Sequence, residues 1–95
     1  MSIGKDEWER RKNSLSVGQL VIGVVVHHAT FGVFVDLGEG LLGLIEVFEM
    51  PGGKEITTDD YPKLGSTVPA QVLGFKDHDR EVILSMKRTP ERDTG

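Results

Sequence analysis

The sequence predicts an all-β fold: a small, partly open, five-stranded antiparallel Greek-key barrel preceded by a short N-terminal helix. Three observations support this prediction. Residues 18–46 contain three apolar runs rich in Val, Ile and Phe, which suit a pleated, half-buried surface. Two further apolar runs lie at residues 68–75 and 81–86. The longest irregular connection, residues 47–64, separates the two groups, as expected where the chain crosses over a barrel.

The helix is expected at residues 6–15. Its first turn carries acidic side chains and residues 10–12 are basic, and both placements complement the helix dipole. Trp8 and Leu15 are seven residues apart and share one face, through which the helix should pack against the strands. The alternative for Trp8 is a role in stacking on a ligand.

The first three strands are expected at residues 20–26, 31–37 and 41–45. The joint between the second and third strands, Gly38-Glu39-Gly40, supplies the positive φ angles that a tight hairpin needs. We therefore expect an antiparallel meander.

The connection at residues 47–64 contains Pro51-Gly52-Gly53, which prevents regular structure. Residues 57–60, Thr-Thr-Asp-Asp, can cap one short helical turn. Connections of this length are usually crossovers or binding loops.

The last two strands are joined by residues 76–80, which contain no glycine but include Asp and His, residues that tolerate left-handed backbone angles better than most. Residues 88–95 are expected to be a disordered polar tail. Residues 1–15 then form an N-terminal flank, and residues 16–87 form the barrel domain.

Composition limits the class of protein. A chain of 95 residues suffices for one small domain, and without Cys it has neither disulfides nor thiolate metal sites. No apolar run approaches membrane-spanning length and the N-terminus is not signal-like, so we expect a cytoplasmic protein. No nucleophile triad or phosphate-binding glycine loop is recognisable, which predicts a protein that is not an enzyme and has no cofactor or metal.

The charge is unevenly distributed. Residues 16–85 carry four basic and ten acidic side chains, a net charge of −6, whereas each flank carries +1, giving −4 in all. Because fixed positive charge attracts a phosphate backbone, the barrel itself offers little general affinity for nucleic acid.

Six sequence pieces nevertheless fall in the order and spacing of a known RNA-binding family. They are Val17-Gly18 with Gly23 and Val25, then Phe31-Gly32-Val33-Phe34-Val35-Asp36, Gly43-Leu44-Ile45, Gly65, Val72-Leu73, and Ile83-Leu84-Ser85-Met86-Lys87. Over about residues 16–87 the chain resembles an S1 domain, the RNA-binding oligonucleotide-binding (OB) fold named after a ribosomal protein. This module also occurs in polynucleotide phosphorylase, ribonuclease E and translation initiation factors.

The resemblance implies that single-stranded RNA lies across the second and third strands and stacks on Phe31 and Phe34. Residues three apart on a regular strand point to opposite faces, so both can face outward only if the strand bends at Gly32. The alternative is that Phe31 belongs to the core. Stacking is worth ~1–3 kcal/mol per base and tolerates any sequence, so we expect weak, sequence-tolerant binding.

Several positions depart from the family pattern. Glu46 stands where the family often has a His on the RNA side, and Phe48 stands where a Ser is usual. Lys76 and Arg80, in the last hairpin, are candidate RNA contacts, but acidic neighbours make an ordinary solvated turn the alternative.

His27 and His28 are neighbours on a strand, so they point to opposite faces and cannot share a metal. Each is a candidate for the aromatic face, and we include His28 in the predicted RNA site.

The first strand also predicts a second kind of surface. Ile22, Val24 and Val26 alternate with the presumed core positions and would form an apolar stripe, which is typical of a protein contact. Coverage by the leading helix or by the tail is the alternative. An alternative function is therefore a protein-interaction module that keeps the S1 fold and has lost most of its RNA affinity, which the acidic barrel and Glu46 favour.

Overall fold

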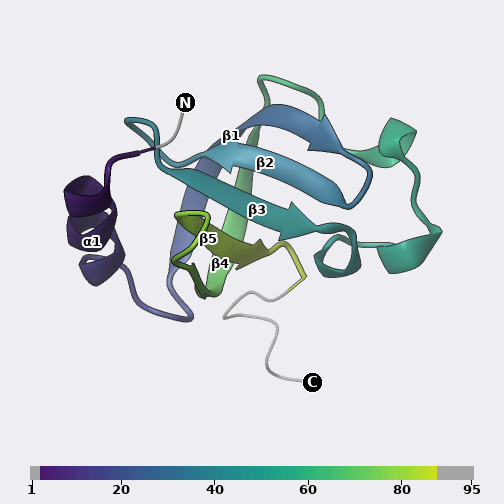
Figure 1. Cartoon of the computed structure of the whole chain (residues 1–95). Helices are drawn as coiled ribbons and strands as arrows, with labels where there is room; N and C mark the ends of the chain where they lie inside the picture. Colours follow the sequence, from purple (N-terminus) through teal and green to yellow (C-terminus); the bar gives the residue numbers. More distant parts are fainter. Residues whose placement is uncertain (1–2, 88–95) are drawn as a thin grey trace.

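Five strands close into a barrel in the order β1-β2-β3-β5-β4, and one helix packs at its end (Figure 1). This computed structural model describes residues 3–87, and the predicted tail at residues 88–95 lies outside them. The prediction of a five-stranded barrel with a short N-terminal helix is confirmed. The elements are α1 (Lys5–Asn13), β1 (Leu20–Ala29), β2 (Gly32–Asp36), β3 (Leu42–Glu46), β4 (Thr67–Lys76) and β5 (Glu81–Ser85).

The barrel is closed by one parallel pair, β3 with β5, whereas the other four pairs are antiparallel. The crossover after β3 brings β4 back beside β1, so β5 returns along β3 in the same direction. Inward side chains from the strands, among them Val33, Val35 and Leu84, are fully buried and form the core.

β1 is longer than expected because of a bulge at its centre. The register with β2 shifts between Val25 and His27, which leaves Val26 as an extra residue, and pairing then continues to Ala29. A bulge of this kind bends a strand and changes which side chains face outward beyond it. β2 accordingly begins at Gly32, one residue later than expected, and Phe31 lies in the preceding turn.

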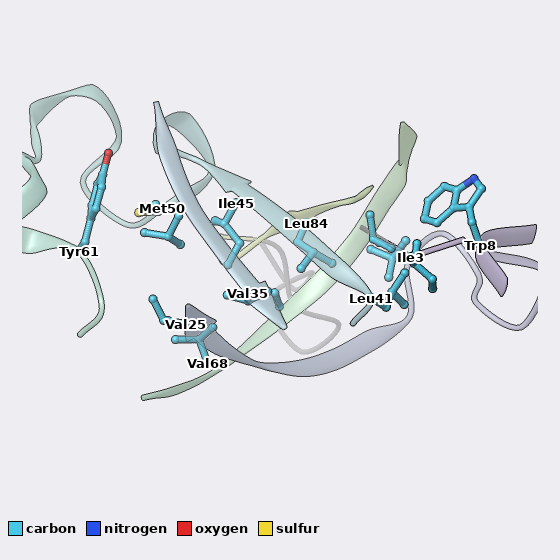
Figure 2. Close-up of a cluster of buried hydrophobic side chains, with 14 residues drawn as sticks. Ile3, Trp8, Val25, Val35, Leu41, Ile45, Met50, Tyr61, Val68 and Leu84 are labelled. Carbon is cyan, nitrogen blue, oxygen red and sulfur yellow. The ribbon is translucent and has the colours of Figure 1, made fainter. Parts of the chain in front are cut away.

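Each end of the barrel is filled by an aromatic side chain (Figure 2). Trp8 of α1 is only 1% exposed; Ile3 and Leu41 lie beside it at one end, and Met50 and Tyr61 lie at the other. The Trp8 indole N–H donates to a carboxylate oxygen of Asp77 at 3.0 Å. The prediction that Trp8 packs rather than stacks on a ligand is therefore confirmed.

α1 covers the end of the barrel and leaves the outer side of β1 exposed. Ile22, Val24 and Val26 remain accessible among the described residues, so the alternative that the leading helix covers them is wrong. Leu15 packs against the core instead. With nine residues, α1 is too short to cross a membrane, and residues 3–87 contain no longer helix.

The crossover between β3 and β4 contains three single turns of 3-10 helix, at Val47–Glu49, Gly53–Glu55 and Thr58–Asp60. The predicted cap of the third turn is confirmed: the Thr57 hydroxyl accepts from the Asp59 N–H, and the Asp60 carboxylate accepts from the Thr57 N–H. The Tyr61 hydroxyl donates to the Ala29 carbonyl at 2.8 Å, which fastens the crossover to the end of β1.

Left-handed backbone angles occur in the turn between β2 and β3 and in the turn between β4 and β5. Gly38, Glu39 and Gly40 all have positive φ angles, as predicted. In the turn before β5 the left-handed residue is Arg80, with φ 56°, rather than an Asp or His. Its guanidinium donates to the carbonyl of Ile3 at 2.9 Å, a long-range contact that helps to fix this turn.

Candidate nucleic-acid interface

An aromatic pair, Phe31 and Phe34, stands at the start of β2 on the outer side of the barrel. Val33 and Val35 point into the core, which turns Phe34 between them outward. The ring of Phe31 lies 6.0 Å from that of Phe34, edge to face, and Phe31 is 52% exposed while Phe34 is half-buried. Phe31 is therefore not a core residue.

Both rings can face outward because Phe31 lies in the turn before β2, where strand alternation does not apply. Gly32 allows the chain to pass close to β3. A Cβ atom at this position would stand 2.3 Å from the Ile45 carbonyl oxygen and 2.8 Å from the Glu46 Cα, both of which are backbone atoms.

His27 extends the pair to a row of three rings. It pairs with Phe34 across β1 and β2, is exposed, and its ring lies 5.9 Å from the Phe34 ring. His28 lies against the crossover instead. Its ring centroid is 5.2 Å from that of Tyr61, and its Nε2 lies 2.8 Å from the Pro62 carbonyl oxygen. The structure thus brings His27, and not the predicted His28, to the aromatic pair.

Glu46 lies at the end of β3 as the cross-strand partner of Gly32, so it is adjacent to the aromatic pair and exposed. Asp36, two residues beyond Phe34 on β2, adds a second carboxylate, which accepts the Gly38 N–H at 2.6 Å. The aromatic row is therefore flanked by negative charge.

Lys76 and Arg80 lie away from this row. Lys76 is at the end of β4, and the strand pairing links it through Glu81 of β5 and Leu42 of β3 to Asp36 rather than to Phe34. Its ammonium group is 3.3 Å from the Asp79 carboxylate. Hydrogen bonds from His78 and then Lys76 lower the pKa of Asp79. Arg80 is directed to the Ile3 carbonyl, near the barrel end that α1 covers.

Glu81, the cross-strand partner of Lys76, has its pKa raised by partial burial and then by the neighbouring charge of Asp79. The last hairpin therefore presents acidic groups together with its one strand-end lysine.

A second exposed aromatic lies beyond Glu46. Phe48 is 62% exposed in the first turn of the crossover, and its carbonyl accepts a hydrogen bond from the Lys87 ammonium group at 3.1 Å. Sequence reasoning treated Phe48 only as a departure from a family pattern, although a large apolar residue in a polar connection was a usable signal. His27 was a candidate for the aromatic face but was left out of the predicted site, because the β1 bulge that turns it toward Phe34 has no marker in the sequence.

The comparisons with known proteins agree with this geometry. A family model described as the S1 RNA binding domain matches residues 14–87. The chain is 32% identical over 83 residues to 4-hydroxy-3-methylbut-2-enyl diphosphate reductase from Clostridium tetani, covering 87% of this chain and 13% of the relative. It is 31% identical over 87 residues to the small ribosomal subunit protein bS1 of Staphylococcus aureus, covering 90% of this chain and 22% of that protein.

Among solved structures, the solution structure of GSP13 from Bacillus subtilis is similar, with a TM-score of 0.68 and 26% identity over 77% of this chain and 56% of that one. The chain spans less than a quarter of the two curated relatives, so it corresponds to one module within each.

Proposed function

The chain belongs to the S1 RNA-binding domain family, and from this premise we propose that it is a non-catalytic module that binds single-stranded RNA. Binding is weak and tolerant of sequence, and it occurs by stacking of bases on Phe31 and Phe34. The observation that carries the proposal is the outward-facing aromatic pair on β2, with its rings 6.0 Å apart. A base can contact the face of an aromatic ring whatever its identity, which explains the expected tolerance of sequence.

His27 enlarges the stacking surface beside Phe34. Its imidazole can stack on a base or, when protonated, attract a phosphate. It replaces His28 in the proposed site, because His28 is engaged by Tyr61 and Pro62.

Charge keeps the proposed affinity low. Glu46 and Asp36 flank the aromatic row, whereas Lys76 and Arg80 are held by Asp79 and by the Ile3 carbonyl. Carboxylates repel phosphate and few cations are available to release counterions, so stacking supplies most of the binding energy. A cytoplasmic location is part of the proposal, whereas the reductase activity of the Clostridium relative is not.

The test is an NMR titration of the 15N-labelled protein with an oligouridylate. Amide shifts should cluster at His27, Phe31–Phe34 and Glu46, and the variant Phe31→Ala/Phe34→Ala should lose them. Ile22→Thr is the matched control, because Ile22 is exposed on β1 five residues from His27, about 16 Å along the strand. If millimolar RNA leaves the spectrum of the parent unchanged, the proposal fails.

A second candidate function is that of a protein-interaction module with little RNA affinity. The specific observation in its favour is the exposed apolar side of β1, which lies outside the aromatic row.

A further inference from the structure

The outward positions in the first part of β1, up to the bulge at Val26, are all apolar. Leu20, Ile22, Val24 and Val26 are 48%, 67%, 39% and 46% exposed, and together they form what we call the β1 stripe. A barrel strand normally alternates apolar side chains toward the core with polar ones toward water. Soluble monomers rarely expose a contiguous apolar patch without a binding role.

Within residues 3–87 the β1 stripe remains exposed. α1 is placed beyond one end of the barrel (Figure 1), where Trp8 and Leu15 pack against the core. Residues 88–95, Arg-Thr-Pro-Glu-Arg-Asp-Thr-Gly, contain one apolar side chain, Pro90. A sequence of this kind has almost no apolar area to bury against the stripe.

The backbone of β1 limits how a partner can bind. β1 is paired with β4 along one edge over residues 20–24 and with β2 along the other edge over residues 24–29, and the stripe residues project from the outer face between these edges. A partner that covers this face is therefore recognised through side chains, as in the docking of an amphipathic helix.

The groove beside the stripe carries negative charge. Ile22, Val24 and Val26 line one side, and Leu37, Asp36 and Glu39 line the other. The Glu39 side chain is 85% exposed, in the turn between β2 and β3. The nearby Arg11 guanidinium is 4.0 Å from Glu39 and is shared with Glu7 at 3.9 Å, so the acids remain in excess.

We propose that the β1 stripe is the docking surface for an amphipathic helix of a partner protein, with apolar side chains at helical spacing and Lys or Arg along their border. The apolar face would cover Ile22, Val24 and Val26, and the basic border would meet Asp36 and Glu39. This surface adjoins the aromatic row at Val26 and Asp36 but extends away from it to Ile22.

Three designed peptides of equal length serve as probes: a Leu/Lys amphipathic helix, a Leu/Glu amphipathic helix, and a scrambled Leu/Lys sequence without an apolar face. Binding is followed by NMR shifts and calorimetry on the full chain. The Leu/Lys helix should shift Ile22, Val24, Val26 and Gly38, and the other two peptides should bind at least tenfold more weakly.

Variants then assign the binding to the β1 stripe. Ile22→Thr and Glu39→Lys should each weaken the binding of the Leu/Lys peptide at least fivefold. Retention of the RNA-induced shifts in Ile22→Thr shows that the barrel of this variant is intact. Phe48→Ser, which removes an equally exposed apolar side chain outside the stripe, should leave peptide affinity unchanged.

Equal binding of all three peptides, no binding, or equal effects of Ile22→Thr and Phe48→Ser would overturn the proposal. Sedimentation equilibrium of the parent protein measures whether the chain associates with itself. Self-association that Ile22→Thr abolishes would identify a second copy of the chain as the occupant, and the proposed helix would be wrong.

Discussion

At the scale of single residues, Phe31 and Phe34 contact each other but differ in burial, so truncation should affect them differently. Phe31→Ala should change the free energy of unfolding by no more than about 0.5 kcal/mol, because the ring is largely exposed. Phe34→Ala should cost about 1–2 kcal/mol, less than the ~3–5 kcal/mol of a fully buried Phe. Each should weaken RNA binding by ~1–3 kcal/mol.

Urea unfolding and RNA titration of the same samples check both quantities. A large loss of stability in Phe31→Ala would show that the ring supports the fold, and the proposed stacking site would shrink to Phe34.

Glu46 gives a second prediction at this scale, because its carboxylate lies beside the aromatic pair. Repulsion of a nearby phosphate amounts to about 1 kcal/mol at the surface at low salt and less when screened. Glu46→His should therefore tighten RNA binding several-fold, most clearly below about pH 6.5, where an imidazole is charged. Glu46→Gln should recover only the part due to repulsion. Unchanged affinity in both variants would show that RNA does not pass over Glu46.

The aromatic pair could be predicted because its motif is local, but its surroundings could not. His27 reaches Phe34 only through the bulge at Val26, and a bulge depends on pairing with β2. The Arg80 guanidinium donates to the carbonyl of Ile3, 77 residues earlier in the chain, and is therefore not directed toward the aromatic pair. Contacts of such long range leave no trace in the residues that flank either side chain.

At the scale of elements, α1 should be part of the folded barrel, since Trp8 fills its end. Trp8→Ala should lower the free energy of unfolding by ~3–5 kcal/mol. Trp8→Phe keeps most of the apolar area and loses the hydrogen bond to Asp77, so it should cost clearly less. Thermal and urea unfolding provide the measurement; a loss below about 1 kcal/mol in Trp8→Ala would mean that the barrel is stable without α1.

The docking of α1 should also depend on pH through Asp77. The Lys12 ammonium, and then the Trp8 indole, donate to this carboxylate and lower its pKa below the ordinary value of 3.8. A carboxyl with a depressed folded-state pKa stabilises the fold above its unfolded pKa and loses this contribution as the pH falls through the folded value. Stabilisation should therefore be complete at neutral pH and decline below about pH 4.

Fluorescence of Trp8, the single Trp of the chain, reports this transition directly. Asp77→Asn should remove the part of the acid transition that belongs to α1. An identical fluorescence titration in parent and variant would exclude Asp77 as its source.

The strands were predictable at this scale because alternating apolar runs and glycine-containing joints are local features, and β3 and β5 lie close to the expected residues. Their parallel pairing and the extension of β1 to Ala29 follow from how the chain closes on itself. Helix α1 ends two residues early, after which Ser14 and Leu15 close its last turn with bonds to Arg11 and Lys12.

At the scale of the whole molecule, the barrel carries an aromatic row around the start of β2 and an adjoining apolar stripe on the first part of β1. Both surfaces are bordered by carboxylates, Glu46 and Asp36 at the first and Asp36 and Glu39 at the second. Negative charge should weaken RNA binding at the proposed stacking surface and favour a basic partner at the proposed docking surface. The net charge of −4 thus affects the two proposed ligands in opposite directions.

The dependence of RNA binding on salt should reveal which cations meet phosphates. Each phosphate neutralised on a single strand adds about −0.7 to the slope of log K against log salt. For this acidic barrel we expect a slope that corresponds to only one or two neutralised phosphates. Lys76, about half exposed at the end of β4, can meet only an RNA strand long enough to extend well beyond the aromatic pair. Lys76→Ala should therefore leave the binding of a trinucleotide unchanged. For a decanucleotide it should reduce the slope of log K against log salt by about 0.7.

Arg80→Ala should instead lower the free energy of unfolding and leave this slope unchanged, because the Arg80 guanidinium donates to the Ile3 carbonyl. A slope that falls in Arg80→Ala and not in Lys76→Ala would mean that Arg80 leaves Ile3 when RNA binds, and that the strand runs toward α1.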